Sequence, residues 1–223
     1  GEMAAGIAHE VNQPLTAVAN YSRVARRLLS GKDLDKQKLD QLLEKIDTQV
    51  VRASEVVQRV RNFVKKPNAG VSLVDPNTLM REVVDLAEVD SRVHDVAVHF
   101  EPKSDLPLMP MDVLGVQQVA LNLIRNAMES MVAAENTGPG VLVTTELTQG
   151  QVYFTIADQG LGIKEGEELQ LFDPFFSTKS NGMGIGLSIC QSMVHSMGGK
   201  IGFKRNDGAG ASFYFSLQAG PKE

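Results

Sequence analysis

The sequence of 223 residues has one cysteine, no tryptophan and no long uninterrupted apolar run. A single cysteine, Cys190, excludes an internal disulfide and a cysteine-built metal site, and its apolar helical surroundings favour buried packing. No segment approaches the roughly 18 to 20 apolar residues that span a bilayer, and the first residues show no signal-peptide pattern. We therefore expect this part of the protein to lie in the cytoplasm.

The charged residues divide the chain into two parts of opposite sign. Residues 1–66 carry 12 Lys and Arg against 8 Asp and Glu, whereas residues 67–223 carry 10 against 19. The two net charges, +4 and −9, indicate two parts with separate electrostatics. No run of Lys and Arg is longer than two residues, and tryptophan is absent. This composition argues against a basic, aromatic nucleic-acid surface.

Residues 1–66 show two apolar patterns with steps of three and four, separated by Gly31-Lys32-Asp33. The patterns run through Ala4, Ala8, Val11, Leu15, Val18, Ala25 and Leu29, and then through Leu39, Leu43, Ile46, Val50, Ala53, Val57, Val60 and Val64. Such spacing predicts two helices joined as a hairpin. Further apolar positions leave more surface than one hairpin covers, so we expect two copies to form a dimeric four-helix bundle.

The first predicted helix also has a polar stripe, which points away from the apolar seam. It consists of His9, Gln13, Thr16, Asn20, Arg23 and Arg27. Pro14 lacks the amide that would bond the carbonyl of Glu10, so we expect a bend beside His9. Because the pattern begins inside a helix with no cap before it, we expect the sequence to be part of a longer protein.

A linker is predicted at residues 67–70, followed by a domain over 71–223 in which helices alternate with short strands. The predicted strands are 71–74, 96–100, 141–147, 151–157, 200–205 and 212–217, and the predicted helices are 76–91, 112–134 and 184–197. Asp75-Pro76 and Asp112 provide helix caps. This order predicts an α/β sandwich whose helices cover one face of the sheet.

Two short motifs in this domain supply oxygen ligands and close backbone approach. Asn122 and Asn126 lie four residues apart on one helix face, where amide oxygens can hold Mg²⁺ beside phosphates. Asp158 follows an apolar strand, and its carboxylate suits an adenine amino group, while Gly160 and Gly162 admit a ligand. Taken singly, the two asparagines are equally typical of a solvated face, and the segment at Asp158 is more typical of a common turn than of a ligand site.

Two further motifs follow along the chain. The segment Phe172-Asp173-Pro174-Phe175-Phe176-Ser177-Thr178-Lys179 places three aromatic residues in a loop and predicts a lid. The segment Gly182-Met183-Gly184-Ile185-Gly186-Leu187-Ser188 opens a helix, whose free amides favour phosphate. Its G-x-G-x-G spacing is neither the dinucleotide-binding pattern nor the P-loop pattern, so both of those classes lose support.

In this order, the four motifs resemble the Bergerat-type ATP-binding domain that histidine kinases share with gyrase, Hsp90 and MutL. The upstream segment Ala8-His9-Glu10-Val11-Asn12-Gln13-Pro14-Leu15 resembles the phosphoacceptor segment of sensor histidine kinases, which the other ATPases lack. The chain is therefore identified as similar to the transmitter region of a bacterial two-component sensor histidine kinase. Two of its motifs, His-Glu-x-x-Gln-Pro-Leu and Asp-Pro-Phe-Phe-Ser-Thr-Lys, are similar to those of the nitrogen-fixation and dicarboxylate-sensing subgroup.

This resemblance implies that His9 attacks the γ-phosphate of ATP, with Glu10 as the base. The phosphoryl group would then pass to an aspartate on the receiver domain of a response regulator. Asn126 would ligate Mg²⁺. The implied nucleotide-binding residues are Asn122, Asn126, Asp158, Gly160, Gly162, Lys179, Gly182, Gly184, Gly186, Leu187 and Ser212. The resemblance also implies a homodimer, and a parent protein attached to the inner membrane only through segments upstream of this sequence.

Two positions depart from related patterns. Gln13 stands where many members have a Thr or Asn that orients water for dephosphorylation, so phosphatase activity is left open. Asn122 stands where purely hydrolytic relatives have a carboxylate that activates water, which disfavours hydrolysis as the main task. A nucleotide-binding scaffold without phosphoryl transfer is the other alternative, and the intact pair of His9 and Glu10 counts against it.

Overall fold

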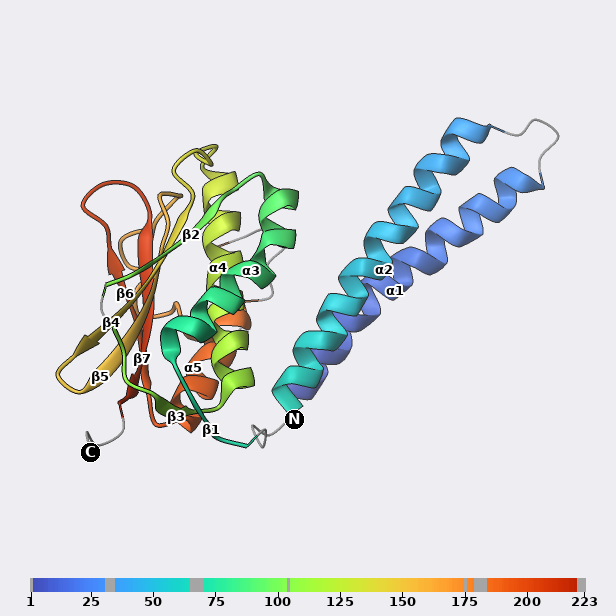
Figure 1. The fold of residues 1–223 in the computed structure, drawn as a ribbon. Helices are drawn as coiled ribbons and strands as arrows, with labels where there is room; N and C mark the ends of the chain where they lie inside the picture. Colours follow the sequence, from blue (N-terminus) through green and yellow to red (C-terminus); the bar gives the residue numbers. More distant parts are fainter. Residues whose placement is uncertain are drawn as a thin grey trace. The chain divides into compact units, whose positions relative to one another are not determined.

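The computed structural model describes residues 2–30, 35–64, 70–103, 105–174, 176–178 and 184–219. Only the backbone is described at residues 2–11, 48, 51–52, 54–64 and 89. The chain divides into two compact units, residues 1–66 and residues 67–223 (Figure 1), and each is described by itself.

The first unit is a helical hairpin built from α1 (Glu2–Leu29) and α2 (Lys36–Val64). The two helices expected from the spacing of apolar residues are therefore confirmed. Helix α1 continues through Pro14, and the bend expected there stays a prediction. Ala25 and Ala53, which belong to the two predicted seams, are 7% and 8% exposed. Small side chains at these positions let the helix backbones approach each other.

The hairpin leaves large apolar side chains in contact with solvent. Among its described side chains, the large apolar ones with exposed fractions from 42% to 59% are Leu15, Val24, Leu29, Leu43 and Val50. Two of them, Leu43 and Val50, lie seven residues apart and so share one face of α2. A single hairpin therefore does not cover its own apolar surface.

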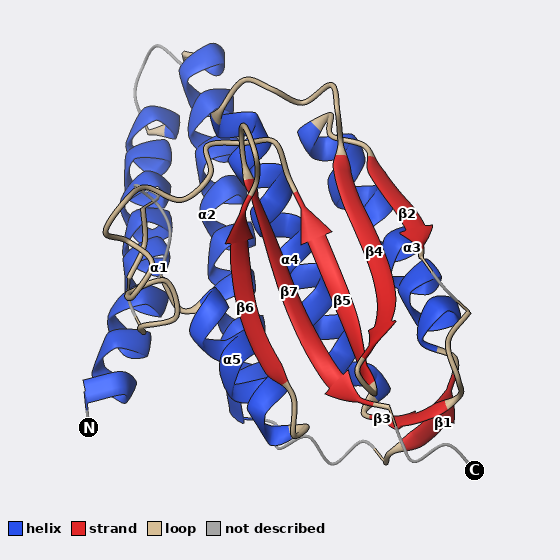
Figure 2. Cartoon of the chain, turned by 90° about the vertical axis from the view of Figure 1, so that its left-hand side faces the viewer, coloured by secondary structure: helices blue, strands red, loops and turns tan. Residues whose placement is uncertain are grey.

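The second unit is an α/β sandwich, as predicted. Its elements are β1 (Ser72–Val74), α3 (Pro76–His94), β2 (Val98–Pro102), β3 (Met109–Met111), α4 (Val113–Ala133), β4 (Val141–Thr148), β5 (Gln151–Ala157), α5 (Gly186–Ser196), β6 (Lys200–Arg205) and β7 (Ala211–Gln218). The main sheet has the strand order β2-β4-β5-β7-β6, in which only β2 and β4 are parallel. Helices α3, α4 and α5 lie behind this sheet in Figure 2, on one face.

Helices α3 and α4 begin at capping side chains that the sequence predicts. Asp75 precedes Pro76, and its carboxylate accepts hydrogen bonds from the Asn77 amide at 2.9 Å and the Thr78 hydroxyl at 2.8 Å. Asp112 accepts a bond from the Gly115 amide at 3.0 Å. Each carboxylate satisfies an amide that the first turn of a helix leaves unpaired.

Most element boundaries differ from the prediction by one to three residues, and one strand was not predicted at all. The short strand β3 was not predicted. Pro110 at its centre is unusual in a strand, yet it pairs with Leu73 of β1 in a two-stranded antiparallel ribbon. Strand β2 starts at Val98, after a left-handed Asp95 ends α3. Helix α5 starts two residues later than predicted because Gly184 has a φ of +64°, which a helix does not accommodate.

The core of the second unit lies between the sheet and its helices. Phe154 of β5 and Phe215 of β7 are cross-strand partners, both fully buried, with stacked rings whose centroids are 4.6 Å apart. From the other side, α4 inserts apolar residues such as Leu123, which is 1% exposed. The regular alternation of buried and half-buried residues along β5 is the period-two pattern of a sheet with one covered face.

Within the described residues, no helix has both the length and the apolar character needed to cross a membrane.

We predict that the same substitution has a large effect on stability at one leucine of this unit and almost none at another. Leu123→Ala should lower the free energy of unfolding by about 2 to 5 kcal/mol, because it leaves a cavity in the core. Leu169→Ala is the control, since Leu169 is 93% exposed, and should change it by less than about 0.5 kcal/mol. Amide hydrogen exchange of β5 and β7 under native conditions measures both values. Equal effects would contradict the assignment of the core.

Candidate nucleotide-binding site

The candidate site is organised along one face of helix α4. Asn122, Asn126 and Ser130 follow one another at intervals of four residues, so they form a polar row on this helix. Asn122 bonds Cys190 in α5, and Ser130 bonds Asp158 at the end of β5. The rise of an α-helix separates the two ends of the row by about 12 Å. Helix α4 thus links two segments that the sequence predicts for phosphate and for adenine.

Asp158 is held in place on its backbone and on its side chain. It is 3% exposed and follows β5, and its amide donates to the carbonyl of Ala211 at 2.9 Å. Its Oδ1 accepts a hydrogen bond from the Gly160 amide at 2.8 Å and one from the Ser130 hydroxyl at 3.4 Å. A buried carboxylate fixed in this way presents a hydrogen-bond acceptor in one defined orientation.

The turn after Asp158 is attached to the end of α4. The Ser130 hydroxyl accepts a bond from the Leu161 amide at 3.1 Å, and the Asn136 side chain donates to the carbonyl of Gln159 at 2.8 Å. Ser130 and Asn136 were not among the predicted site residues. Ser130 could have been found, because it continues the spacing of Asn122 and Asn126 by one more step of four.

The opposite side of the turn is attached to the connection between β6 and β7. Asn206 donates from Nδ2 to the carbonyl oxygen of Asp158 at 2.8 Å, and Ser212 donates to Oδ1 of Asn206 at 2.7 Å. Ser212, predicted to lie near adenine, is therefore two hydrogen bonds from Asp158. The sequence gives no local signal for Asn206, which is distant from Asp158 along the chain.

Glycine is required at two positions around Asp158 for different reasons. A Cβ on Gly160 would lie 2.3 Å from the hydroxyl of Ser130, so the turn packs directly against α4. Gly210 has a φ of +83°, and a Cβ there would lie 2.0 Å from the carbonyl oxygen of Asp158. Gly162, with a φ of +67°, is in the left-handed region as well. Gly210 was not among the predicted site residues.

The other end of the row meets the start of α5. A Cβ on Gly186, the first residue of this helix, would lie 3.2 Å from Nδ2 of Asn122. Leu187, the next residue, is half-buried and packs against the core. The structure thus places Asn122 beside Gly186 at the start of α5. The sequence predicts that this helix start binds phosphate. Gly184 precedes this helix in a left-handed conformation.

Cys190 lies one turn into α5 and is 2% exposed. Burial away from water raises the pKa of its thiol to about 12, although the hydrogen bond from Asn122 acts in the opposite direction. The thiol therefore stays protonated at neutral pH. The expectation of buried packing for this residue agrees with its exposure.

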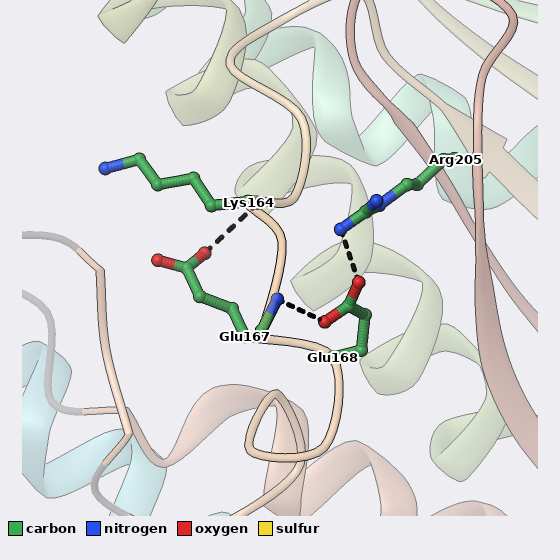
Figure 3. Close-up of polar contacts among 5 residues, drawn as sticks. Lys164, Glu167, Glu168 and Arg205 are labelled. Atoms are coloured by element: carbon green, nitrogen blue, oxygen red, sulfur yellow. Dashed lines mark hydrogen bonds and ion pairs between the residues drawn. The ribbon is translucent and has the colours of Figure 1, made fainter.

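Hydrogen bonds and one ion pair of charged side chains hold the loop that follows Gly162 (Figure 3). The carboxylate of Glu168 pairs with Arg205 at the end of β6 and accepts the Gly166 amide at 2.7 Å, while Glu167 accepts the Lys164 amide at 3.3 Å. The pKa of Glu168 is lowered, first by a hydrogen bond from its own amide and also by the positive charge of Arg205. Arg205 neighbours Asn206, so one corner of the sheet holds both the loop and Asp158.

Several predicted site residues lie outside the described part of the structure. Lys179 and Gly182 belong to residues 179–183, and Phe175 of the predicted lid is also outside. The side chains of His9 and Glu10 are outside as well, while their backbone belongs to α1. Asn126, Gly160, Gly162, Gly184, Leu187 and Ser212 lie within the described part and on the elements given above.

Both units match models of known protein families. Residues 1–69 match the His Kinase A (phospho-acceptor) domain, and residues 111–221 match the histidine kinase-, DNA gyrase B-, and HSP90-like ATPase. The chain belongs to the sensor histidine kinases. Its combination of the two domains separates it from the gyrase and Hsp90 branches, as the motif at His9 predicted.

Named relatives of this histidine kinase agree with the predicted subgroup. The chain is 35% identical over 222 residues to the sensor protein FixL of Bradyrhizobium diazoefficiens, covering 98% of the chain and 43% of FixL. It is 35% identical over 217 residues to the C4-dicarboxylate transport sensor protein DctS of Rhodobacter capsulatus, covering 97% of the chain and 33% of DctS. The chain thus spans less than half the length of either relative.

Solved structures of histidine kinases resemble both units. Histidine kinase ThkA in complex with response regulator protein TrrA has a TM-score of 0.75 at 26% identity, covering 98% of this chain and 61% of that one. Full-length ShkA in complex with AMPPNP has a TM-score of 0.67 at 25% identity, covering 99% and 47%. The predicted helical region followed by an α/β domain is confirmed as the architecture of this family.

We predict that Gly160→Ala weakens nucleotide binding. Its new methyl group would overlap Ser130, so either the turn or α4 must shift and carry Asp158 with it. The affinity for ADP should fall about tenfold or more, measured by isothermal titration calorimetry. Gly138→Ala is the matched control, because a Cβ on this exposed glycine meets nothing within 4 Å. An unchanged affinity in Gly160→Ala would contradict the role of the turn.

Proposed function

We propose that this histidine kinase binds ATP together with Mg²⁺, phosphorylates its own His9 and passes the phosphoryl group to an aspartate of a response-regulator receiver domain. The observation that carries the proposal is the polar row of α4, which joins the start of α5 to the turn at Asp158. The AMPPNP in the ShkA structure and the response regulator in the ThkA structure support the ligand and the partner.

In this proposal, Asp158 receives the adenine amino group, and Gly160 and Gly162 shape the pocket around the base. Such a role suits a buried carboxylate that the Gly160 amide and the Ser130 hydroxyl hold in one orientation. At the phosphate end, amides at Gly182, Gly184 and Gly186 would face the phosphates beside Leu187. Lys179 would approach the phosphates, and Ser212 would support the base end through Asn206.

The residues of the phosphate end fit a magnesium ion that the nucleotide itself helps to hold. Among the described residues, no group of three or more His, Cys, Asp or Glu side chains is arranged to hold a metal. Mg²⁺ commonly keeps several waters and is bound through a few protein oxygens together with substrate phosphates. Asn126 would supply the protein ligand, with Asn122 beside it. When bound, the ion neutralises charge on the phosphates.

Phosphorylation requires a neutral imidazole, and a histidine of ordinary pKa, about 6.5, is mostly neutral at pH 7. A nitrogen of His9 would form a bond to the γ-phosphorus while the bond to the oxygen of ADP breaks. The ring proton would pass to Glu10, which is adjacent in the sequence. Catalysis in such transfers comes mainly from positioning and charge neutralisation.

The helical hairpin is proposed to form a homodimer. Leu43 and Val50 share one face of α2 and are 49% and 47% exposed in the single chain. Pairing two hairpins into a four-helix bundle would cover this face. Because each side chain is already about half covered, its burial would contribute roughly half of the 1.5 to 3 kcal/mol gained by burying a fully exposed one.

We predict that His9→Gln abolishes autophosphorylation because the nucleophile is removed. The wild-type chain, incubated with γ-labelled ATP and Mg²⁺, should acquire label that is labile in acid and stable in alkali. Asn126→Ala should lower labelling by about a hundredfold or more, since the proposed Mg²⁺ ligand is lost. His195→Gln is the control, because His195 is an exposed histidine that matches no motif, and it should label normally.

The same experiment separates the alternatives. Label that persists in His9→Gln would place the acceptor elsewhere. Release of inorganic phosphate without label on the protein would favour an ATPase of the gyrase type. Nucleotide binding with neither outcome would favour a scaffold.

We predict that Leu43→Lys weakens the dimer. A charge in the apolar face of α2 would have to be buried on pairing, so the dissociation constant should rise about tenfold or more. Sedimentation equilibrium over a series of protein concentrations measures this constant. Gln41→Lys adds the same charge at a nearby exposed polar position and should leave it within about twofold. A monomeric wild type would contradict the proposed bundle.

A further inference from the structure

The contact between Asn122 and Cys190 connects the two helices at the phosphate end of the site. Nδ2 of Asn122 donates a hydrogen bond to Sγ of Cys190 at 3.2 Å. Cys190 is 2% exposed and lies four residues after Gly186, on the first turns of α5. Its thiol faces the carbonyl of Val119 at 4.0 Å, so the sulfur can donate to α4 and accept from Asn122.

This contact engages the nitrogen of the Asn122 amide and leaves its oxygen without that partner. The nitrogen and the oxygen of an amide have similar shapes, but only the nitrogen donates hydrogen bonds. With the nitrogen bonded to the buried sulfur, Oδ1 is directed elsewhere. Both ends of the amide lie beside Gly186, since a Cβ there would be 3.2 Å from Nδ2 and 3.3 Å from Oδ1, but only Oδ1 has no donor within the described residues. A hard cation or its water shell requires oxygen at this position rather than an N–H group.

We propose that Cys190 is a positioning residue, whose sulfur holds the Asn122 amide with its oxygen toward the magnesium-bearing phosphates. The inference rests on the proposed function, because it concerns how this chain binds Mg²⁺ with nucleotide. Without the sulfur acceptor, the amide would lose its orientation, and half of its rotations would present an N–H group to the cation. Binding of the base at Asp158 would be unaffected.

The test measures nucleotide affinity rather than enzymatic activity. Dissociation constants of AMPPNP are determined by calorimetry on the full chain, with Mg²⁺ and with EDTA, and their ratio gives the gain in affinity due to the ion. Cys190→Val fills the site but removes the acceptor, and should reduce this gain about threefold to tenfold. Cys190→Ser keeps an acceptor and should retain the gain within about twofold. Affinities in EDTA should be the same in all three chains.

A double-mutant cycle distinguishes positioning from packing. Asn122→Ala should remove the same part of the gain, and adding Cys190→Val to it should cause no further reduction, because Cys190 acts through Asn122. A packing defect would instead lower affinity in EDTA, or would add to the effect of Asn122→Ala. Thermal unfolding of each variant identifies loss of folding.

The outcomes separate this inference from the proposed function. If the wild type binds AMPPNP with a gain from Mg²⁺ and Cys190→Val keeps that gain, the role of Cys190 is wrong and the proposed function stands. An equal loss in Cys190→Ser and Cys190→Val would also overturn it. If the wild type binds no nucleotide or shows no gain from Mg²⁺, both the inference and the proposed function are wrong.

Discussion

The packing of α4 against the main sheet constrains the rest of the second unit. One face of this helix is buried throughout, and Val116, Val119 and Ile124 are fully excluded from solvent. Rotating the helix would expose several such residues, each at about 1.5 to 3 kcal/mol. The direction of the polar row of Asn122, Asn126 and Ser130 is therefore fixed by apolar packing on the neighbouring face. The apolar core of the second unit therefore also orients the polar side chains of the candidate nucleotide site.

The turn at Asp158 depends on this helix as well. Ser130 occupies the space that a side chain at position 160 would need, and it also bonds the carboxylate of Asp158. Asn206 holds the opposite side through the backbone. The turn is thus fixed between a helix and a sheet edge, which is how rigid elements commonly position a functional loop. A buried acceptor prepared in this way loses little conformational entropy when a ligand binds.

The sequence predicted what depends on local periodicity and capping, and it did not predict what depends on distant contacts. The helix starts at Asp75 and Asp112 could be predicted because a capping side chain bonds amides within the first turn of its own helix. The strand at Met109–Met111 exists only because it pairs with residues 72–74, and its central proline gives the opposite local signal. Asn206 likewise has meaning only after the sheet brings it to Asp158. Ser130 was within reach of sequence reasoning, because its spacing repeats that of the two asparagines.

The two ends of the proposed site differ in how many of their polar groups have hydrogen-bond partners within the protein. At the end proposed for the base, the carboxylate, carbonyl and amide of Asp158 all have partners within the fold. At the end proposed for the phosphates, Oδ1 of Asn122 has no partner among the described residues, although Nδ2 of the same amide is bonded to Cys190. ATP and ADP share the adenine, so in the proposed site the contacts of Asp158 would not distinguish them. Discrimination between the two nucleotides would then arise beside Asn122, whose oxygen is available to an ion and to phosphates.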